Sequence, residues 1–162
     1  MTQSSKPLPA SARRVQEELA QLGRDIAVVQ FDASTRSSAD AAAAIGCSVG
    51  QIAKSLIFRA EPSGRPVLVM ASGANRVNER KVESALGEKL AKADAQYVRE
   101  KTGFAIGGVP PVGHTARPVT FIDRDLLGSA EIWAAAGTPN AVFRLTPSEL
   151  IELTGGRVMD LA

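Results

Sequence analysis

Two segments of the sequence combine residue types that can do chemistry. The first runs from Gly103 to His114 (GFAIGGVPPVGH) and contains four of the chain's fourteen glycines, two adjacent prolines and its single histidine. Glycine permits close approach of the backbone, and proline fixes φ and lacks an N–H, so this segment predicts a shaped loop that recognises a ligand through main-chain atoms. The second is Lys54 in the otherwise apolar run 52–58 (IAKSLIF), where an ammonium can hold a phosphate or stabilise developing negative charge.

Each of these features also has a purely structural interpretation. The glycine-rich loop lacks the G-x-G-x-x-G and Walker patterns of nucleotide sites, so an ordinary turn between strands is an equal alternative. Lys54 can instead send its ammonium to water from an edge strand. His114 is more often hydrogen-bonded or exposed than catalytic. Residues 75–81 (NRVNERK) form a basic stretch that either faces phosphate or is simply solvated.

The composition restricts the class of protein. The chain has 162 residues, 44% hydrophobic content and a net charge of +2, which suits one globular domain and is compatible with a nucleic-acid partner. Aromatic residues make up only 4%, which argues against a single-strand binder built on stacked rings. No apolar run reaches the roughly 20 residues that span a bilayer, so no membrane association is expected. The single cysteine favours the cytoplasm, and with one histidine it argues against a zinc site, so neither a metal nor another cofactor is expected.

Hydrophobic periodicity and capping residues predict the elements that position these side chains. Helices are expected at 12–22, 39–45, 79–86, 95–101 and 147–153, with the caps Ser11, Ser38, Asn78, Asp94 and Thr146. Ser48 and Gln51 have the spacing of a capping box. Strands are expected at 26–31, 52–58, 66–71, 119–123, 131–135 and 141–145, of which the second and third form a hairpin.

Strand pairs interrupted by helices, without regular βαβ alternation, predict an α+β fold. We expect a single domain over residues 11–162, with a mixed, largely antiparallel, partly barrel-like sheet flanked by helices. Residues 1–10 have no apolar core and are expected to form a flexible tail.

Taken together, these segments resemble the YbaK-like family of aminoacyl-tRNA deacylases, which are relatives of the editing domain inserted in bacterial prolyl-tRNA synthetases. The resemblance runs in order from about Leu22 to Gly155 and is carried by the stretches 52–58 (IAKSLIF), 81–87 (KVESALG), 102–113 (TGFAIGGVPPVG) and 119–123 (VTFID). The G-x-x-x-P element at Gly107–Pro111, combined with Lys54, is its most specific part.

The resemblance implies a trans-editing hydrolase that cleaves the ester between a wrong amino acid and the terminal adenosine of a tRNA, most typically a proline tRNA. It assigns catalytic roles to Lys54 and Gly107. Because the ester is already activated, positioning a water and stabilising the oxyanion can suffice, with a ribose hydroxyl assisting in place of a protein base. The implied substrate-binding residues are Gly108, Val109, Pro110, Pro111, Gly113 and His114, with Ser55, Asp123, Ser129 and Gly137 as further candidates.

One departure from the family bears on the substrate. Relatives that remove alanine carry a pocket histidine in a late loop, where this chain has the stretch 134–139 (AAAGTP). Small residues there leave room for 2-aminobutyrate or cysteine. Alanine stays open as well, because one methylene discriminates by only about 1–3 kcal/mol.

The expected partner is the acceptor end of a tRNA, with proline tRNA the leading candidate and a prolyl-tRNA synthetase as an optional second partner. The chain is expected to act as a free-standing monomer or weak dimer. Two other functions stay open. The first is a non-catalytic module on the same fold that binds aminoacyl-adenosine or an amino acid, and the second is an enzyme that uses Lys54 as an amine nucleophile.

Overall fold

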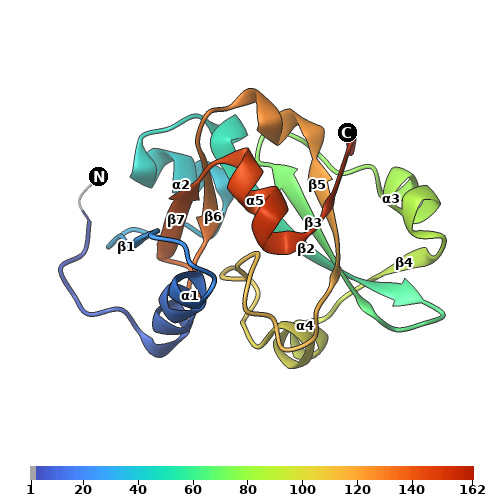
Figure 1. The fold of residues 1–162 in the computed structure, drawn as a ribbon, viewed down its shortest axis with the longest axis horizontal. Helices are drawn as coiled ribbons and strands as arrows, with labels where there is room; N and C mark the ends of the chain where they lie inside the picture. The colour runs from blue at the N-terminus through green and yellow to red at the C-terminus, as the bar shows by residue number, and fades with distance from the viewer. Residues whose placement is uncertain (1–2) are drawn as a thin grey trace.

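A single mixed sheet joins segments from the whole chain (Figure 1). In the computed structural model, which describes residues 3–162, the strand order is β1-β7-β6-β2-β3-β5-β8, with β4 paired to β2. The first two residues of the predicted tail lie outside the described residues. The strands are β1 (Val28–Gln30), β2 (Ile52–Glu61), β3 (Pro66–Ser72), β4 (Lys89–Lys92), β5 (Val119–Asp123), β6 (Ile132–Ala135), β7 (Ala141–Leu145) and β8 (Arg157–Met159).

Helices cover both faces of this sheet. The apolar side chains of α1, α4 and α5 pack on one face with Leu68 and Met70 of β3, and α3 packs on the other face with Val67 and Val69. Because both faces are covered, all seven residues of β3 are buried, which explains why its first six residues, 66–71, are all apolar. The helices in the described part of the chain are α1 (Ala10–Gln21), α2 (Ser38–Ile45), α3 (Glu79–Leu86), α4 (Ala95–Thr102) and α5 (Pro147–Thr154), with 3₁₀ turns η1 (Val49–Gln51) and η2 (Arg124–Gly128).

The pairing of β2 leaves part of one edge open. Over residues 53–59 one edge pairs antiparallel with β3, so that Lys54 lies opposite Ala71. The other edge pairs with β6 at residues 52–53 and with β4 at residues 58–61. Among the described strand pairings, residues 54–57 therefore have no partner on that edge, and this gap is where Lys54 lies.

Most of the predicted architecture is confirmed. The fold is α+β with one mixed sheet, and the predicted hairpin is β2–β3. Side chains of Asn78, Asp94 and Thr146 cap their helices, and Ser48 forms the predicted capping box with Gln51. In the described residues no helix is both long and apolar enough to cross a bilayer.

Two predicted caps are wrong by one or two residues. Helix α1 begins at Ala10 with Pro9 as its N-cap residue, so Ser11 lies inside its first turn. Helix α2 is capped by Ser37, whose Oγ accepts a hydrogen bond from the Asp40 N–H. Leu22, the last residue of the first predicted helix, is the C-cap residue of α1 and is exposed.

The sequence also failed to predict three short elements. Strand β4 (KLAK) begins and ends with exposed lysines, and β8 has only three residues, so neither has a recognisable strand pattern. The turn η2 was not expected because its apolar residues are too few to establish a helical period.

Candidate functional site

A pocket of about 310 Å³ opens beside the free edge segment of β2, and we call it the edge pocket. Its walls come from β2, from the glycine-rich loop, from β6 and β7, and from the segment that leads into α2. The lining residues are Thr35, Arg36, Ser37, Ser38, Ala41, Ile52, Ala53, Lys54, Ser55, Leu56, Ile106, Gly107, Val109, Trp133, Ala134, Ala135 and Val142.

The edge pocket brings together four residues that the sequence singles out. Lys54 and Ser55 come from β2, whereas Gly107 and Val109 come from the glycine-rich loop more than fifty positions later. Pro110 follows in the same loop and is buried outside the pocket lining. Contact of these residues with a substrate stays a prediction, but the fold places the lysine and the loop in one cavity.

Close backbone contacts hold the loop against the turn between β6 and β7. The Gly137 N–H donates to the Gly108 carbonyl at 2.8 Å. A Cβ on Gly108 would lie 2.7 Å from the Thr138 nitrogen, and one on Gly137 would lie 2.6 Å from the Ser11 carbonyl oxygen. Gly137 is not among the residues that line the pocket; its N–H bonds the loop, and its lack of a side chain permits close contact with α1.

Gly107 packs against the side chain of Arg36. It has a φ of 94°, which favours glycine, and a Cβ at this position would lie 2.9 Å from the Arg36 Nε. In the described structure the only hydrogen bond of Arg36 is the one that its backbone N–H donates to Ser34 Oγ. The exposed guanidinium is thus available to an incoming ligand at the pocket mouth.

The ammonium of Lys54 is held by the loop that follows β3. Its Nζ donates to the main-chain carbonyl of Asn75 at 2.6 Å, and the side chain is half-buried. The ammonium is therefore fixed at the pocket wall by a neutral acceptor, and its positive charge is not cancelled by a directly bonded carboxylate.

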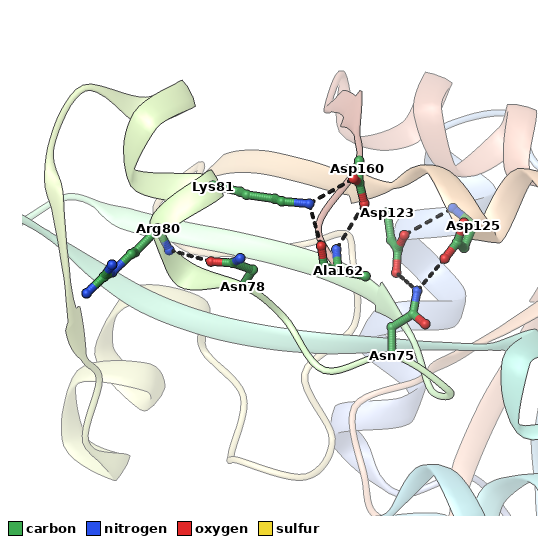
Figure 2. A network of polar contacts seen from close by, with 8 residues as sticks. All are labelled: Asn75, Asn78, Arg80, Lys81, Asp123, Asp125, Asp160 and Ala162. Atoms are coloured by element: carbon green, nitrogen blue, oxygen red, sulfur yellow. Dashed lines mark hydrogen bonds and ion pairs between the residues drawn. The ribbon is translucent and has the colours of Figure 1, made fainter.

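Asp123 lies behind this wall and outside the pocket lining. It is 1% exposed, and its carboxylate accepts hydrogen bonds from the Ser72 N–H, the Asn75 side-chain amide and the Asp125 N–H. Figure 2 shows the Asn75 amide between Asp123 and Asp125. Ser129, another candidate, follows η2 and also lies outside the pocket lining.

Pro111, Gly113 and His114 lie on the other side of the loop, where they line a second pocket of about 250 Å³, here called the histidine pocket. The charged residues in its lining are Glu18 and Arg117. His114 Nε2 donates to the Pro110 carbonyl at 2.6 Å, while Nδ1 is buried without a partner in the described structure. Burial lowers the pKa of His114, although the bond to the carbonyl acts in the opposite direction, so the ring is neutral at pH 7.

The sequence did not indicate the part of the edge pocket that precedes α2. Arg36, Ser37 and Ser38 all line the pocket, and Trp133 faces it from β6. The available signal was the polar run 34–38 (STRSS) directly before an alanine-rich helix, which is typical of a helix N-terminus that can receive an anion.

The electrostatics of the edge pocket favour an anionic ligand. Both of its charged lining residues, Arg36 and Lys54, are cations, and no carboxylate is among the lining residues. In residues 3–162 no group of three or more His, Cys, Asp or Glu side chains is arranged to hold a metal ion. The chemistry that this site can support is binding of a phosphate-bearing substrate and stabilisation of negative charge.

Comparisons with known proteins identify the family of this chain. The aminoacyl-tRNA editing domain model matches residues 32–153, which include the lysine and the glycine-rich loop. A solved structure provisionally described as a trans-editing enzyme for prolyl-tRNA synthetase is 51% identical, covers 96% of this chain and 98% of its own, and superposes with a TM-score of 0.91.

Two curated relatives extend the comparison. YwhH of Bacillus subtilis, whose activity is uncharacterized, is 33% identical over 91% of this chain and 94% of its own length. EbsC of Enterococcus faecalis, provisionally named a Cys-tRNA(Pro)/Cys-tRNA(Cys) deacylase, is 24% identical over 77% of this chain and 76% of its own length. The chain therefore belongs to the aminoacyl-tRNA editing domain family, a class of hydrolases that act on aminoacyl-tRNA, and the resemblance drawn from its motifs is confirmed.

Proposed function

We propose that this protein acts in trans to deacylate proline tRNA that carries a small non-cognate amino acid, namely 2-aminobutyrate, alanine or cysteine. The observation that carries the proposal is the convergence of Lys54 and the Gly107 loop in one pocket whose charged lining residues are both cations. The relatives named for editing of prolyl-tRNA and for Cys-tRNA(Pro) support the choice of tRNA.

The proposed chemistry relies on positioning and charge stabilisation. The acyl carbon of the ester lies against the loop, and a water assisted by a ribose hydroxyl attacks it to form a tetrahedral oxyanion. In the described structure the main-chain N–H groups of Gly107 and Val109 have no hydrogen-bond partner, so they are available as donors to the substrate. Lys54 supplies positive charge near the oxyanion or the adenosine phosphate.

The small lining residues support the proposed size of the amino acid. Ala134 and Ala135 of β6 line the pocket with small side chains. They begin the stretch 134–139, in which alanine-removing relatives carry a pocket histidine. The free guanidinium of Arg36 supports recognition of a phosphate at the acceptor end, because guanidinium groups bind phosphate oxygens in pairs.

A panel of mischarged tRNAs tests the proposal. The purified protein is incubated with proline tRNA charged with alanine, cysteine, serine, threonine or 2-aminobutyrate, and the loss of ester is followed over time. We expect turnover of at least one of the three proposed substrates. Absence of turnover on every member, with binding retained, would favour the non-catalytic module instead.

Substitution of Lys54 tests its catalytic role. Lys54→Ala removes the pocket ammonium and is expected to lower kcat about 100-fold, as for loss of one oxyanion-stabilising group. Lys92→Ala, which removes an exposed lysine from β4 outside the pocket lining, is the matched control and should leave kcat unchanged. Equal activity of both variants would refute the proposed role of Lys54.

A further inference from the structure

We propose that Asp123 and Asn75 are positioning residues for the deacylation, because together they hold the Lys54 ammonium at the wall of the edge pocket. Neither residue lines the pocket, so both act through the lysine. The inference rests on the proposed function, since it concerns the group to which that function assigns the chemistry.

The first step is the bond from Lys54 to Asn75. A lysine side chain has a flexible four-carbon stem, so its ammonium occupies one defined position only if a hydrogen-bond acceptor fixes it. The acceptor is the main-chain carbonyl of Asn75, 2.6 Å from Nζ, in the loop between β3 and α3. The position of the charge therefore depends on the position of this loop.

The second step is the side chain of Asn75, which ties the loop to the end of β5. Its Nδ2 donates to Asp123 Oδ2 at 2.9 Å and to Asp125 Oδ2 at 2.7 Å (Figure 2). The same Asp123 oxygen accepts from the Ser72 N–H at 3.0 Å, at the point where β3 ends. One carboxylate thus fixes both the start of the loop and the residue that binds the lysine.

The third step is the burial of Asp123. A carboxylate that is 1% exposed must be compensated by donors, and here Oδ2 accepts two N–H bonds while Oδ1 accepts the Asp125 N–H at 3.0 Å. An asparagine of the same shape has one acceptor oxygen, so its amide nitrogen would face an N–H group on one side. The substitution therefore removes one hydrogen bond from the network that ties β5 to the loop, without opening a cavity.

The loop is also wedged against another wall of the edge pocket. A Cβ on Gly73 would lie 2.6 Å from the Val49 carbonyl oxygen and 2.8 Å from the Cβ of Ser38, which lines the pocket. Movement of the loop consequently alters the pocket wall as well as the lysine. A charge that moves by about 1 Å can cost about 100-fold in rate.

The test is a double-mutant cycle with Lys54→Ala. Single-turnover deacylation is measured with the chosen mischarged tRNA for Asp123→Asn and Asn75→Ala, each with Lys54 intact and in the Lys54→Ala background. Asn75→Ala keeps the carbonyl and removes only the amide, so it serves if Asp123→Asn fails to fold. Asp160→Asn is the matched control, because this exposed carboxylate binds Lys81 and lies outside the pocket lining (Figure 2).

With Lys54 intact, both variants should lower the maximal single-turnover rate constant about 10- to 100-fold with the affinity for tRNA nearly unchanged, and Asp160→Asn should change neither quantity. In the Lys54→Ala background the same substitutions should cause no further loss. An equal loss in both backgrounds would overturn the positioning role and leave the proposed function intact. Full activity of Lys54→Ala alone would refute the catalytic role of Lys54, and the positioning role with it, whereas absence of deacylation by the wild type would overturn the proposed function.

Discussion

One loop separates two pockets that differ in charge. The edge pocket and the histidine pocket are of similar volume, about 310 and 250 Å³. In the edge pocket the charged lining residues are the cations Arg36 and Lys54, whereas the histidine pocket combines Glu18 with Arg117. Two cations attract a phosphate and an oxyanion, but opposite charges largely cancel at a distance. This difference in charge favours the edge pocket, and not the histidine pocket, as the place for the proposed editing chemistry.

The two sides of the loop also differ in what their glycines do. Gly107 and Gly113 both have a positive φ, of 94° and 75°. The space beside Gly107 is occupied by Arg36, whereas a Cβ on Gly113 would make only an ordinary contact, 3.5 Å from Glu18 Cγ. Both positions therefore need the left-handed backbone conformation that glycine adopts easily. Only at Gly107, beside the edge pocket, does a neighbouring side chain also leave no room for a Cβ.

Alanine substitutions at these two glycines give the largest expected contrast. Each should cost about 1–2 kcal/mol in the free energy of unfolding, because both force an L-residue into the left-handed region. Gly107→Ala should also displace Arg36 and the loop and lower kcat/KM about 100-fold. Gly113→Ala should retain nearly full activity.

Urea unfolding and deacylation of mischarged proline tRNA measure both quantities for the two variants. Gly113→Ala is the control for backbone strain. Equal losses of activity in the two variants would mean that strain, and not the shape of the edge pocket, limits the reaction.

Local signals explain how much of the fold the sequence could predict. The sequence predicted three helix caps correctly, namely Asn78, Asp94 and Thr146. Each of them directly precedes a segment with helical periodicity, and each of these helices ends at a glycine. Strand β4 could not be predicted from the sequence, because it is stabilised by pairing with β2 and has no recognisable pattern of alternating apolar residues. Pairing between segments that are distant in the sequence is a tertiary effect, and the β-propensities of the individual residues do not predict it.

The same limit applies to the site. Lys54 and the Gly107 loop were unusual in type and spacing, so the sequence singled them out. Arg36 was not unusual, and its place at the pocket mouth depends on where α2 packs. The link from Asp123 to Lys54 could not be predicted either. It depends on the main-chain carbonyl of Asn75, and because every residue has such a carbonyl, the sequence does not mark this one.

An intermediate effect is expected for Arg36, the cation at the mouth of the edge pocket. Arg36→Ala should lower kcat/KM about 10-fold on mischarged tRNA, as for loss of one hydrogen bond to a charged group. Arg36→Lys should recover part of the loss, because it restores the charge but not the paired donors.

The substrate decides whether Arg36 binds phosphate. With an aminoacyl-adenosine that has no 5′-phosphate, wild type and Arg36→Ala should react at the same rate, whereas adding the 5′-phosphate should favour the wild type. A loss of the same size on both substrates would show that Arg36 acts through the shape of the loop.

The smallest effect is expected in the histidine pocket, on stability and not on chemistry. Burial lowers the pKa of His114 in the folded protein, so between its ordinary value near 6.5 and the lower folded value the unfolded chain binds more protons. Stability should therefore fall as the pH falls below about 6.5, by at most about 1.4 kcal/mol per pH unit. His114 is the chain's only histidine, so His114→Gln should flatten this part of the profile while deacylation at pH 7.5 stays near that of wild type. Urea unfolding from pH 7.5 to pH 5 measures the profile, and parallel profiles for the two proteins would contradict the assignment.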